Sequence, residues 1–190
     1  MAFAKKNEIV LLHDNPYTHI LTKEPISILS IPGAKEVAME LNSLSKAFNM
    51  PGWRVGMLAG REDWIAKVLK VKSNMDSGMF LGIQKGAIAA LNLGETWFAD
   101  LESTYQSRRK LVWKLADKLH LTYDTKAAGL FVWCKVPDGR TADELVDELL
   151  YERNIFITPG KIFGSEGENY VRFSLCMPEF KILEAIKRIQ

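Results

Sequence analysis

The pattern of apolar and polar positions in the first third of the chain predicts strands of a parallel sheet. Mostly apolar runs of strand length occupy residues 9–13, 37–41 and 55–59. A run that is apolar on both faces is typical of a strand buried between two neighbours in such a sheet. For the run at 9–13, sequence preceding Met1 is expected to supply neighbours.

From Arg61 onward the apolar positions recur at helical spacing instead. One helix is expected around residues 64–71, followed by a break at residues 73–78. A longer helical tract then runs from about residue 80 to residue 120, and Gly94 is expected to divide it into two helices.

After residue 120 the pattern predicts a second, smaller region. Strands are expected at residues 130–136, 155–158 and 170–176, with one helix beginning near Thr141 and another covering residues 182–189. Alternating strands and helices indicate an α/β fold. We place the domain boundary near residue 120, which gives a larger domain at 1–120 and a smaller one at 121–190.

Composition and charge exclude several classes of protein. The 190 residues carry 25 basic and 23 acidic side chains, for a net charge of +2, which argues against a dedicated nucleic-acid or membrane surface. The densest basic run, Arg108 to Lys110, is interpreted as the solvated face of a helix. The two cysteines, Cys134 and Cys176, are not spaced as metal ligands or as a disulfide framework, so no metal is expected. No apolar run is long enough to span a bilayer and no secretory signal opens the chain, so a cytoplasmic setting is expected.

The stretch from Ser43 to Gly56 carries the most informative chemistry. It reads Ser-Leu-Ser-Lys-Ala-Phe-Asn-Met-Pro-Gly-Trp-Arg-Val-Gly and lies between two predicted strands. The amine of Lys46, when neutral, can form a Schiff base with a carbonyl group. Ser43 and Arg54 add a hydroxyl and a guanidinium, which are groups that bind phosphate. Gly56 has no Cβ and is expected to let the backbone turn closely around that phosphate.

This stretch resembles the cofactor-attachment motif of the class I and II aminotransferases, in which Ser-x-x-Lys is followed eight residues later by Arg-x-Gly. Ser43, Lys46, Arg54 and Gly56 fill its key positions. The resemblance implies that Lys46 bonds covalently to pyridoxal 5′-phosphate (PLP) and moves the proton during catalysis, while Ser43 and Arg54 bind the cofactor phosphate. The simpler interpretation is a surface lysine and arginine on a loop, and the length of the pattern argues against it.

A second part of the resemblance follows the first predicted strand. Asp14 and Tyr17 lie directly after residues 9–13, and ligands of α/β sheets bind where strands end. Asp-Asn-Pro is also an ordinary turn signal. In the resembled family an Asp-x-x-Tyr unit occupies this place, with the aspartate paired to the protonated pyridine nitrogen of PLP and the tyrosine bonded to the 3-oxygen. The resemblance implies these roles for Asp14 and Tyr17.

The third part is an arginine on a predicted strand of the smaller domain. Along residues 170–176 the apolar side chains alternate with polar ones, which leaves Arg172 and Ser174 on the polar face. An isolated strand arginine often makes a structural salt bridge. The resembled family carries an arginine here that binds the α-carboxylate of the substrate in a bidentate manner, and the resemblance implies this role for Arg172.

Over the whole chain the resemblance implies the later part of a fold type I protein. It consists of part of the large PLP domain, with a mostly parallel sheet, and the small C-terminal α/β domain. The implied activity is ping-pong transfer of an amino group between an amino acid and a 2-oxo acid, by a homodimer in the full-length protein. The phosphate-cradling turn, the aromatic that stacks on the cofactor ring and an asparagine that reaches its 3-oxygen have no counterpart here. The chain is therefore interpreted as a piece cut from a longer protein or a natural truncation, inactive alone.

Two alternatives share part of the pattern. A PLP-dependent β-lyase of sulfur amino acids would use the same residues, and its products, pyruvate and a thiol, would distinguish it. A PLP-binding module of a transcription regulator would need a basic helix-turn-helix segment upstream, and this sequence contains no basic domain. The amino-acid substrate is not identified by these residues.

Overall fold

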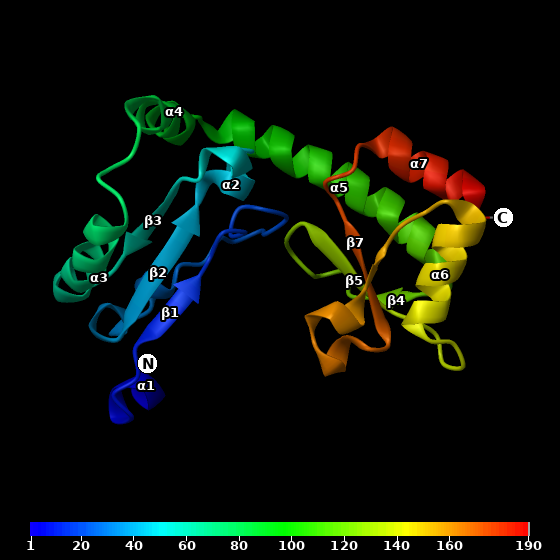
Figure 1. Ribbon diagram of the computed structural model, residues 1–190, viewed down its shortest axis with the longest axis horizontal. Helices are drawn as coiled ribbons and strands as arrows, with labels where there is room; N and C mark the ends of the chain where they lie inside the picture. Colours follow the sequence, from blue (N-terminus) through cyan, green and yellow to red (C-terminus); the bar gives the residue numbers. More distant parts are fainter. Residues whose placement is uncertain (190) are drawn as a thin grey trace. The chain divides into compact units, whose positions relative to one another are not determined.

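The computed structural model describes residues 1–189, and the chain divides into two compact units. The first comprises residues 1–99 and the second begins at residue 100. The division falls within helix α5 (Glu95–Lys118), whereas the sequence analysis places the domain boundary after this helix. Figure 1 shows α5 as one continuous helix, whose first residues belong to the first unit and whose remainder belongs to the second.

The first unit is built on a three-stranded sheet with the order β1-β2-β3. Its strands are β1 (Leu11–Asp14), β2 (Ala38–Ser43) and β3 (Gly56–Ala59), each close to its predicted position. β1 and β2 are parallel, and β3 is antiparallel to β2. In this chain β1 is an edge strand and Leu12 is 55% exposed, so β1 has β2 as its one neighbouring strand among the described residues.

Four helices accompany this sheet before α5. They are α1 (Ala2–Lys6), α2 (Leu44–Ala47), α3 (Glu62–Met75) and α4 (Leu81–Leu91), together with the short 3₁₀ helices η1 (Ile28–Ser30), η2 (Ala34–Glu36) and η3 (Pro51–Trp53). The predicted break at residues 73–78 begins too early, since α3 continues to Met75. Ser73 Oγ and Asn74 Nδ2 both donate to the carbonyl of Lys70, at 3.1 and 2.6 Å, so these polar residues extend the last turn.

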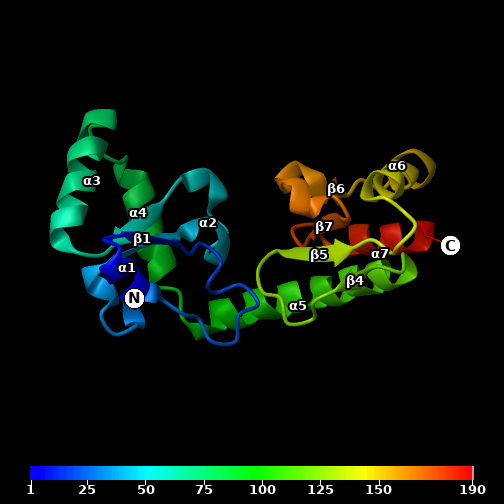
Figure 2. The same ribbon diagram turned by 90° about the horizontal axis from the view of Figure 1, so that it is seen from below.

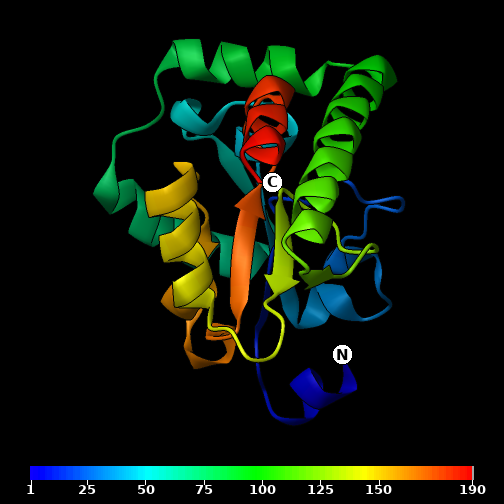
Figure 3. The same cartoon turned by 90° about the vertical axis from the view of Figure 1, so that its right-hand side faces the viewer.

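The second unit is built on a four-stranded antiparallel sheet with the order β4-β5-β7-β6. The strands are β4 (Thr122–Tyr123), β5 (Phe131–Lys135), β6 (Thr158–Pro159) and β7 (Tyr170–Ser174). Its helices are α6 (Ala142–Arg153), α7 (Glu179–Arg188), η4 (Gly160–Phe163) and η5 (Ser165–Gly167). Figure 2 shows the later part of α5 running along this sheet, and Figure 3 shows α6 and α7 beside β5 and β7.

The core of the second unit lies between the sheet and its helices. Alternate side chains of the central strands are buried, as the predicted alternation of β7 requires, and they meet apolar side chains of α6 and α7. These residues are Val132, Cys134, Val171, Phe173, Leu145, Leu149 and Ile182. Burial raises the pKa of the Cys134 thiol to about 12, with a smaller contribution from the Asp117 carboxylate, whereas Cys176 is exposed.

The predicted strand at residues 155–158 is mostly wrong, because only Thr158 is in β6. Asn154 ends α6 in a left-handed conformation with φ 53°. The N–H of Ile155 then donates to the carbonyl of Leu149 at 2.8 Å. This bond caps the last turn of α6, so the N–H of Ile155 is not used in strand pairing.

The interpretation of Arg108 and Arg109 as a solvated face is also wrong. The Arg108 guanidinium lies 5.6 Å from the centroid of the Tyr105 ring, and its Nη1 donates to the carbonyl of Leu175 at 3.2 Å. Arg109 lies 4.9 Å from the centroid of a Trp113 ring. Both side chains are therefore half-buried against neighbouring parts of the second unit.

No helix in residues 1–189 is long and apolar enough to cross a membrane. Within the same residues, no group of three or more histidine, cysteine, aspartate or glutamate side chains is arranged to hold a metal ion.

Candidate active site

The predicted cofactor residues of the first unit gather where β1 and β2 end. Because these strands are parallel, their carboxyl ends meet at one edge of the sheet, the edge at which ligands bind in α/β folds. Asp14 is the last residue of β1 and pairs in register with Leu41. Ser43 ends β2, and Lys46 lies in α2 directly after it. Figure 1 shows both strands pointing toward α2.

Lys46 is half-buried, and its amine faces an aromatic ring. Nζ lies 5.7 Å from the centroid of the Tyr17 ring, which follows β1. Among the described residues, no salt bridge includes Lys46. The amine is thus held beside a phenol without a carboxylate to neutralise it.

Ser43 is the N-cap of α2. Its Oγ accepts a hydrogen bond from the N–H of Ser45 at 3.1 Å and donates to Ser45 Oγ at 2.9 Å. The N–H of Ser43 donates to Asn42 Oδ1 at 2.8 Å. The Ser43 hydroxyl is thus held in place at the end of β2 by its own turn.

Arg54 is exposed and has an unusual backbone. Its φ is 54°, in the left-handed region that few non-glycine residues adopt, and Nη1 donates to the carbonyl of Pro51 at 2.8 Å. Gly56, two residues later, pairs in register with Ser43, which brings the arginine segment next to the serine. A Cβ at Gly56 would lie 2.7 Å from the carbonyl oxygen of Asn42. The glycine permits the close approach of β3 to β2.

Apolar side chains from α2, the segment after it and α4 pack together and hold α2 in place. Leu44, Met50 and Val55 form a buried cluster with Ala90 of α4, and Phe48 packs against it. The Phe48 ring also meets the ring of Phe98 of α5 edge-to-face at 5.6 Å. The lysine segment therefore rests on a well-packed support.

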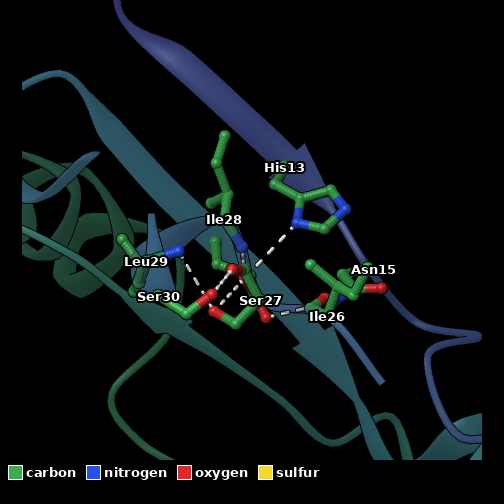
Figure 4. Close-up of polar contacts among 8 residues, drawn as sticks. His13, Asn15, Ile26, Ser27, Ile28, Leu29 and Ser30 are labelled. Atoms are coloured by element: carbon green, nitrogen blue, oxygen red, sulfur yellow. Dashed lines mark hydrogen bonds and ion pairs between the residues drawn. The ribbon is translucent and has the colours of Figure 1, made fainter. Parts of the chain in front are cut away.

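One buried carboxylate near this edge was missed by the sequence analysis. Glu40 on β2 accepts hydrogen bonds from side chains of β1 and of the segment after it, and from residues 27 and 28, as Figure 4 shows. A signal was present in the sequence, because Glu40 shares a strand face with the small apolar Ala38 and interrupts the apolar run from Val37 to Leu41. A charged residue at such a position is rare unless it is paired.

Arg172 belongs to the second unit and is held between two aromatic rings. Its guanidinium carbon lies 4.1 Å from the ring centroids of both Phe131 and Phe163. The residue also lines a pocket of about 430 Å³, to which α5 and α7 contribute further side chains. The prediction that Arg172 and Ser174 lie on the less buried face of β7 is confirmed. Asp14, Tyr17, Ser43, Lys46 and Arg54 all lie in the first unit.

Comparisons with known proteins agree with this arrangement. The family model described as aminotransferase class I and II matches residues 1–189. A protein of Oleidesulfovibrio alaskensis named LL-diaminopimelate aminotransferase is 41% identical over 192 residues, which cover 100% of this chain and 50% of the relative. A protein of Aquifex aeolicus with the same name is 42% identical, over 99% of this chain and 49% of the relative. The chain spans about half the length of the curated relatives it matches.

The fold is similar to solved structures of the same kind. Apo-BacF from Bacillus subtilis superimposes with a TM-score of 0.90 at 34% identity, covering 99% of this chain and 49% of that one. A probable N-succinyldiaminopimelate aminotransferase from Thermus thermophilus gives a TM-score of 0.87 at 33% identity, covering 99% of this chain and 51% of that one. These matches confirm the predicted fold class and the resemblance noted in the sequence. The chain belongs to the class I and II aminotransferases.

Proposed function

We propose that this chain is the C-terminal half of a PLP-dependent enzyme that transfers an amino group between an amino acid and a 2-oxo acid. The observation that carries the proposal is the position of Lys46, whose amine lies 5.7 Å from the Tyr17 ring at the carboxyl edge of β1 and β2. The family match and the names of the relatives support the same activity.

The residues at this edge suit PLP in their chemistry. PLP carries an aldehyde, a phosphate, a basic ring nitrogen and a ring oxygen, and when bound it supplies an electron-withdrawing ring next to the reacting carbon. The edge offers an amine at Lys46, a hydroxyl at Ser43 and an exposed guanidinium at Arg54. Asp14 is exposed at the end of β1 and offers a carboxylate.

Each residue then has a role in the proposed reaction. Lys46 would hold the cofactor through its aldehyde and would act as the general base that moves the substrate Cα proton. Asp14 would pair with the protonated ring nitrogen, and the Tyr17 hydroxyl would donate to the ring oxygen. Ser43 and Arg54 bind the phosphate.

Substrate recognition is assigned to Arg172 in this proposal. A guanidinium binds a carboxylate in a bidentate manner, and the aromatic rings of Phe131 and Phe163 hold this one in a fixed orientation. LL-diaminopimelate is the first amino acid to test, because relatives 41 and 42% identical to this chain carry its name. The relatives' names support neither a β-lyase nor a transcription regulator.

The organisation of the whole protein is part of the proposal. Residues 1–120 are assigned to the large PLP domain and residues 121–190 to the small domain, in a homodimer that works in the cytoplasm. The exposed apolar side chains of α3 and α4 support a larger assembly, because a free surface of this kind is unfavourable in water.

Borohydride reduction tests the cofactor site. The full-length protein is incubated with PLP, reduced and digested, and the pyridoxyl group is located by peptide mass mapping. We expect the label on Lys46, and expect Lys46→Ala to lose both the label and amino-group transfer while keeping the folded state. A label on Lys35 or Lys67 instead, with full transfer activity in Lys46→Ala, would contradict the proposal.

A further inference from the structure

Glu40 is an ionisable side chain buried in the first unit without a task in the proposed reaction. It is 8% exposed, and with Ser45 it makes up the buried polar residues among those described. Burying a carboxylate is costly unless hydrogen bonds replace the lost water. The hydrogen bonds that Glu40 accepts from protein groups show which parts of the chain it joins.

Four donors converge on the Glu40 carboxylate from three segments. His13 Nδ1 on β1 lies 3.3 Å from Oε2, and Asn15 Nδ2 donates to Oε1 at 3.2 Å. Ser27 Oγ and the N–H of Ile28 donate to Oε2 at 2.5 and 2.9 Å. Figure 4 shows these groups around one point between β1, β2 and residues 26–30.

The hydrogen bonds keep this carboxylate ionised. Burial alone would raise the pKa of Glu40, but the hydrogen bonds from Ser27, Asn15, the N–H of Ile28 and His13 together outweigh it and hold the pKa below its ordinary value. Each donor therefore meets a charged acceptor, and charge-assisted hydrogen bonds are about twice as strong as neutral ones.

Two of the four donors flank Asp14 in the sequence. His13 precedes it and Asn15 follows it, and the N–H of Asn15 also donates to the carbonyl of Leu41 at 2.8 Å. Side chains alternate along a strand, so the neighbours of Asp14 turn toward Glu40 while Asp14 faces the other way and is exposed. Glu40 thus binds the residues on both sides of Asp14.

The same carboxylate sits on the strand that leads to the lysine. β2 continues from Glu40 to Ser43, where α2 begins and carries Lys46. A group anchored on β2 that binds both neighbours of Asp14 fixes the end of β1 relative to the start of α2. A buried carboxylate that needs several specific donors is satisfied in one alignment of β1 against β2. An apolar side chain at the same place would not select one alignment.

We propose that Glu40 is a positioning residue for the aminotransferase reaction, whose carboxylate sets the place of Asp14 relative to Lys46. This inference rests on the proposed function, in which Asp14 pairs with the cofactor ring nitrogen. Glu40 does not touch the cofactor in this scheme; it acts through His13 and Asn15.

The experiment uses the full-length protein loaded with PLP and the variant Glu40→Gln. Glutamine has nearly the same volume, but one of its two polar groups is an N–H₂ donor. It cannot accept hydrogen bonds at both positions, so some of the groups that donate to Glu40 lose their acceptor. We expect the visible circular dichroism of bound PLP to change, because it reports the orientation of the ring. We also expect kcat to fall by on the order of tenfold or more with KM little changed, since a small misplacement of a catalytic group costs about a hundredfold.

Two further variants separate positioning from folding. Asn15→Ala removes a donor next to Asp14 but leaves the bonds of Ser27 and Ile28 to Glu40 in place, and it should change the dichroism in the same sense. Ser30→Ala is the matched control, because Ser30 Oγ donates to the carbonyl of Ser27 at 2.7 Å and does not contact Glu40. It should leave the dichroism and kcat as in the wild type.

The outcomes distinguish this inference from the function on which it rests. Wild-type protein that binds no PLP would contradict both. PLP bound normally in the wild type, with unchanged dichroism and kcat in Glu40→Gln and Asn15→Ala, would overturn the role of Glu40 alone. If Glu40→Gln does not fold, Asn15→Ala decides by the same two measurements.

Discussion

Trp97 donates a hydrogen bond from Nε1 to the carbonyl oxygen of Ala47 at 2.8 Å, across 50 residues of sequence. The bond joins the first turn of α5 to the residue that follows Lys46. Trp97→Phe removes the donor, and the carbonyl of the buried residue Ala47 then lacks this hydrogen bond. We therefore expect the free energy of unfolding to fall by about 1 to 3 kcal/mol. Urea unfolding followed by far-ultraviolet circular dichroism measures this loss.

A matched control is available in Trp113. Its Nε1 is buried and has no hydrogen-bond partner among the described residues, so Trp113→Phe removes the same ring volume without breaking a hydrogen bond. Its loss measures ring contacts alone, which for Trp113 include stacking on Tyr123 and the Arg109 guanidinium. We expect Trp113→Phe to cost less than Trp97→Phe, and a smaller loss in Trp97→Phe would contradict a contribution from its hydrogen bond.

Arg172 is expected to govern recognition of the substrate carboxylate. In the full-length enzyme, Arg172→Ala should weaken kcat/KM for amino acids by about 2–5 kcal/mol, the range for removing one partner of a desolvated charge pair. PLP affinity, measured by fluorescence titration, should stay nearly the same. Arg140→Ala is the control, since Arg140 is a half-buried arginine of the second unit that pairs with Glu148. Lost PLP binding with normal substrate affinity in Arg172→Ala would move the residue to the phosphate site.

The buried carboxylate of Glu40 should make stability depend on pH. Its native pKa lies below the ordinary value, so its ionised form stabilises the fold above the ordinary carboxyl range, and this contribution is lost as pH falls through the native pKa. The difference in unfolding free energy between wild type and Glu40→Gln should therefore shrink from neutral to acidic pH. His13 faces the carboxylate and can itself gain a proton as the pH falls. The comparison of wild type with Glu40→Gln is therefore repeated with His13→Asn present in both proteins, which removes the histidine. A difference that stays constant with pH would refute the account.

Residues 1–190 expressed alone are expected to self-associate and to lack amino-group transfer. Large apolar side chains are exposed along the edge strand and α3, where a hydrophobic surface favours association. They are Val10, Leu12, Leu69, Val71 and Met75. Analytical ultracentrifugation and a transfer assay with added PLP and 2-oxoglutarate check the two expectations. Robust turnover by a monomer would show that the active site needs nothing beyond this chain.

Local signals allowed most elements to be predicted from the sequence. The start of α6 is an example, since Thr141 Oγ1 accepts from the N–H of Glu144 at 3.2 Å and the Glu144 carboxylate accepts from the N–H of Thr141 at 2.9 Å. Both residues of this capping box lie within four positions, so the pattern is visible without the fold. The lysine motif is similarly contiguous, from Ser43 to Gly56.

Features that depend on distant partners could not be predicted. The position of Glu40 on its strand signals burial, but its donors lie 12 to 27 residues away in sequence, so its partners follow only from the pairing of β1 with β2. β4 is two residues long and exists because Thr122 and Tyr123 pair with β5. The strand expected at residues 155–158 failed because its β-branched residues follow the end of a helix, and tertiary contacts outweigh propensity.

The contrast between the two cysteines makes this chain suitable for attaching a single spectroscopic probe. Cys134 is fully enclosed and its thiol stays protonated, so a maleimide dye has neither access nor a thiolate to react with there. Cys176 is exposed, two residues after the end of β7, and its N–H donates to Ser174 Oγ at 3.2 Å. A dye would therefore attach to this chain at Cys176 without any mutation, four residues beyond Arg172, and would report changes around the end of β7.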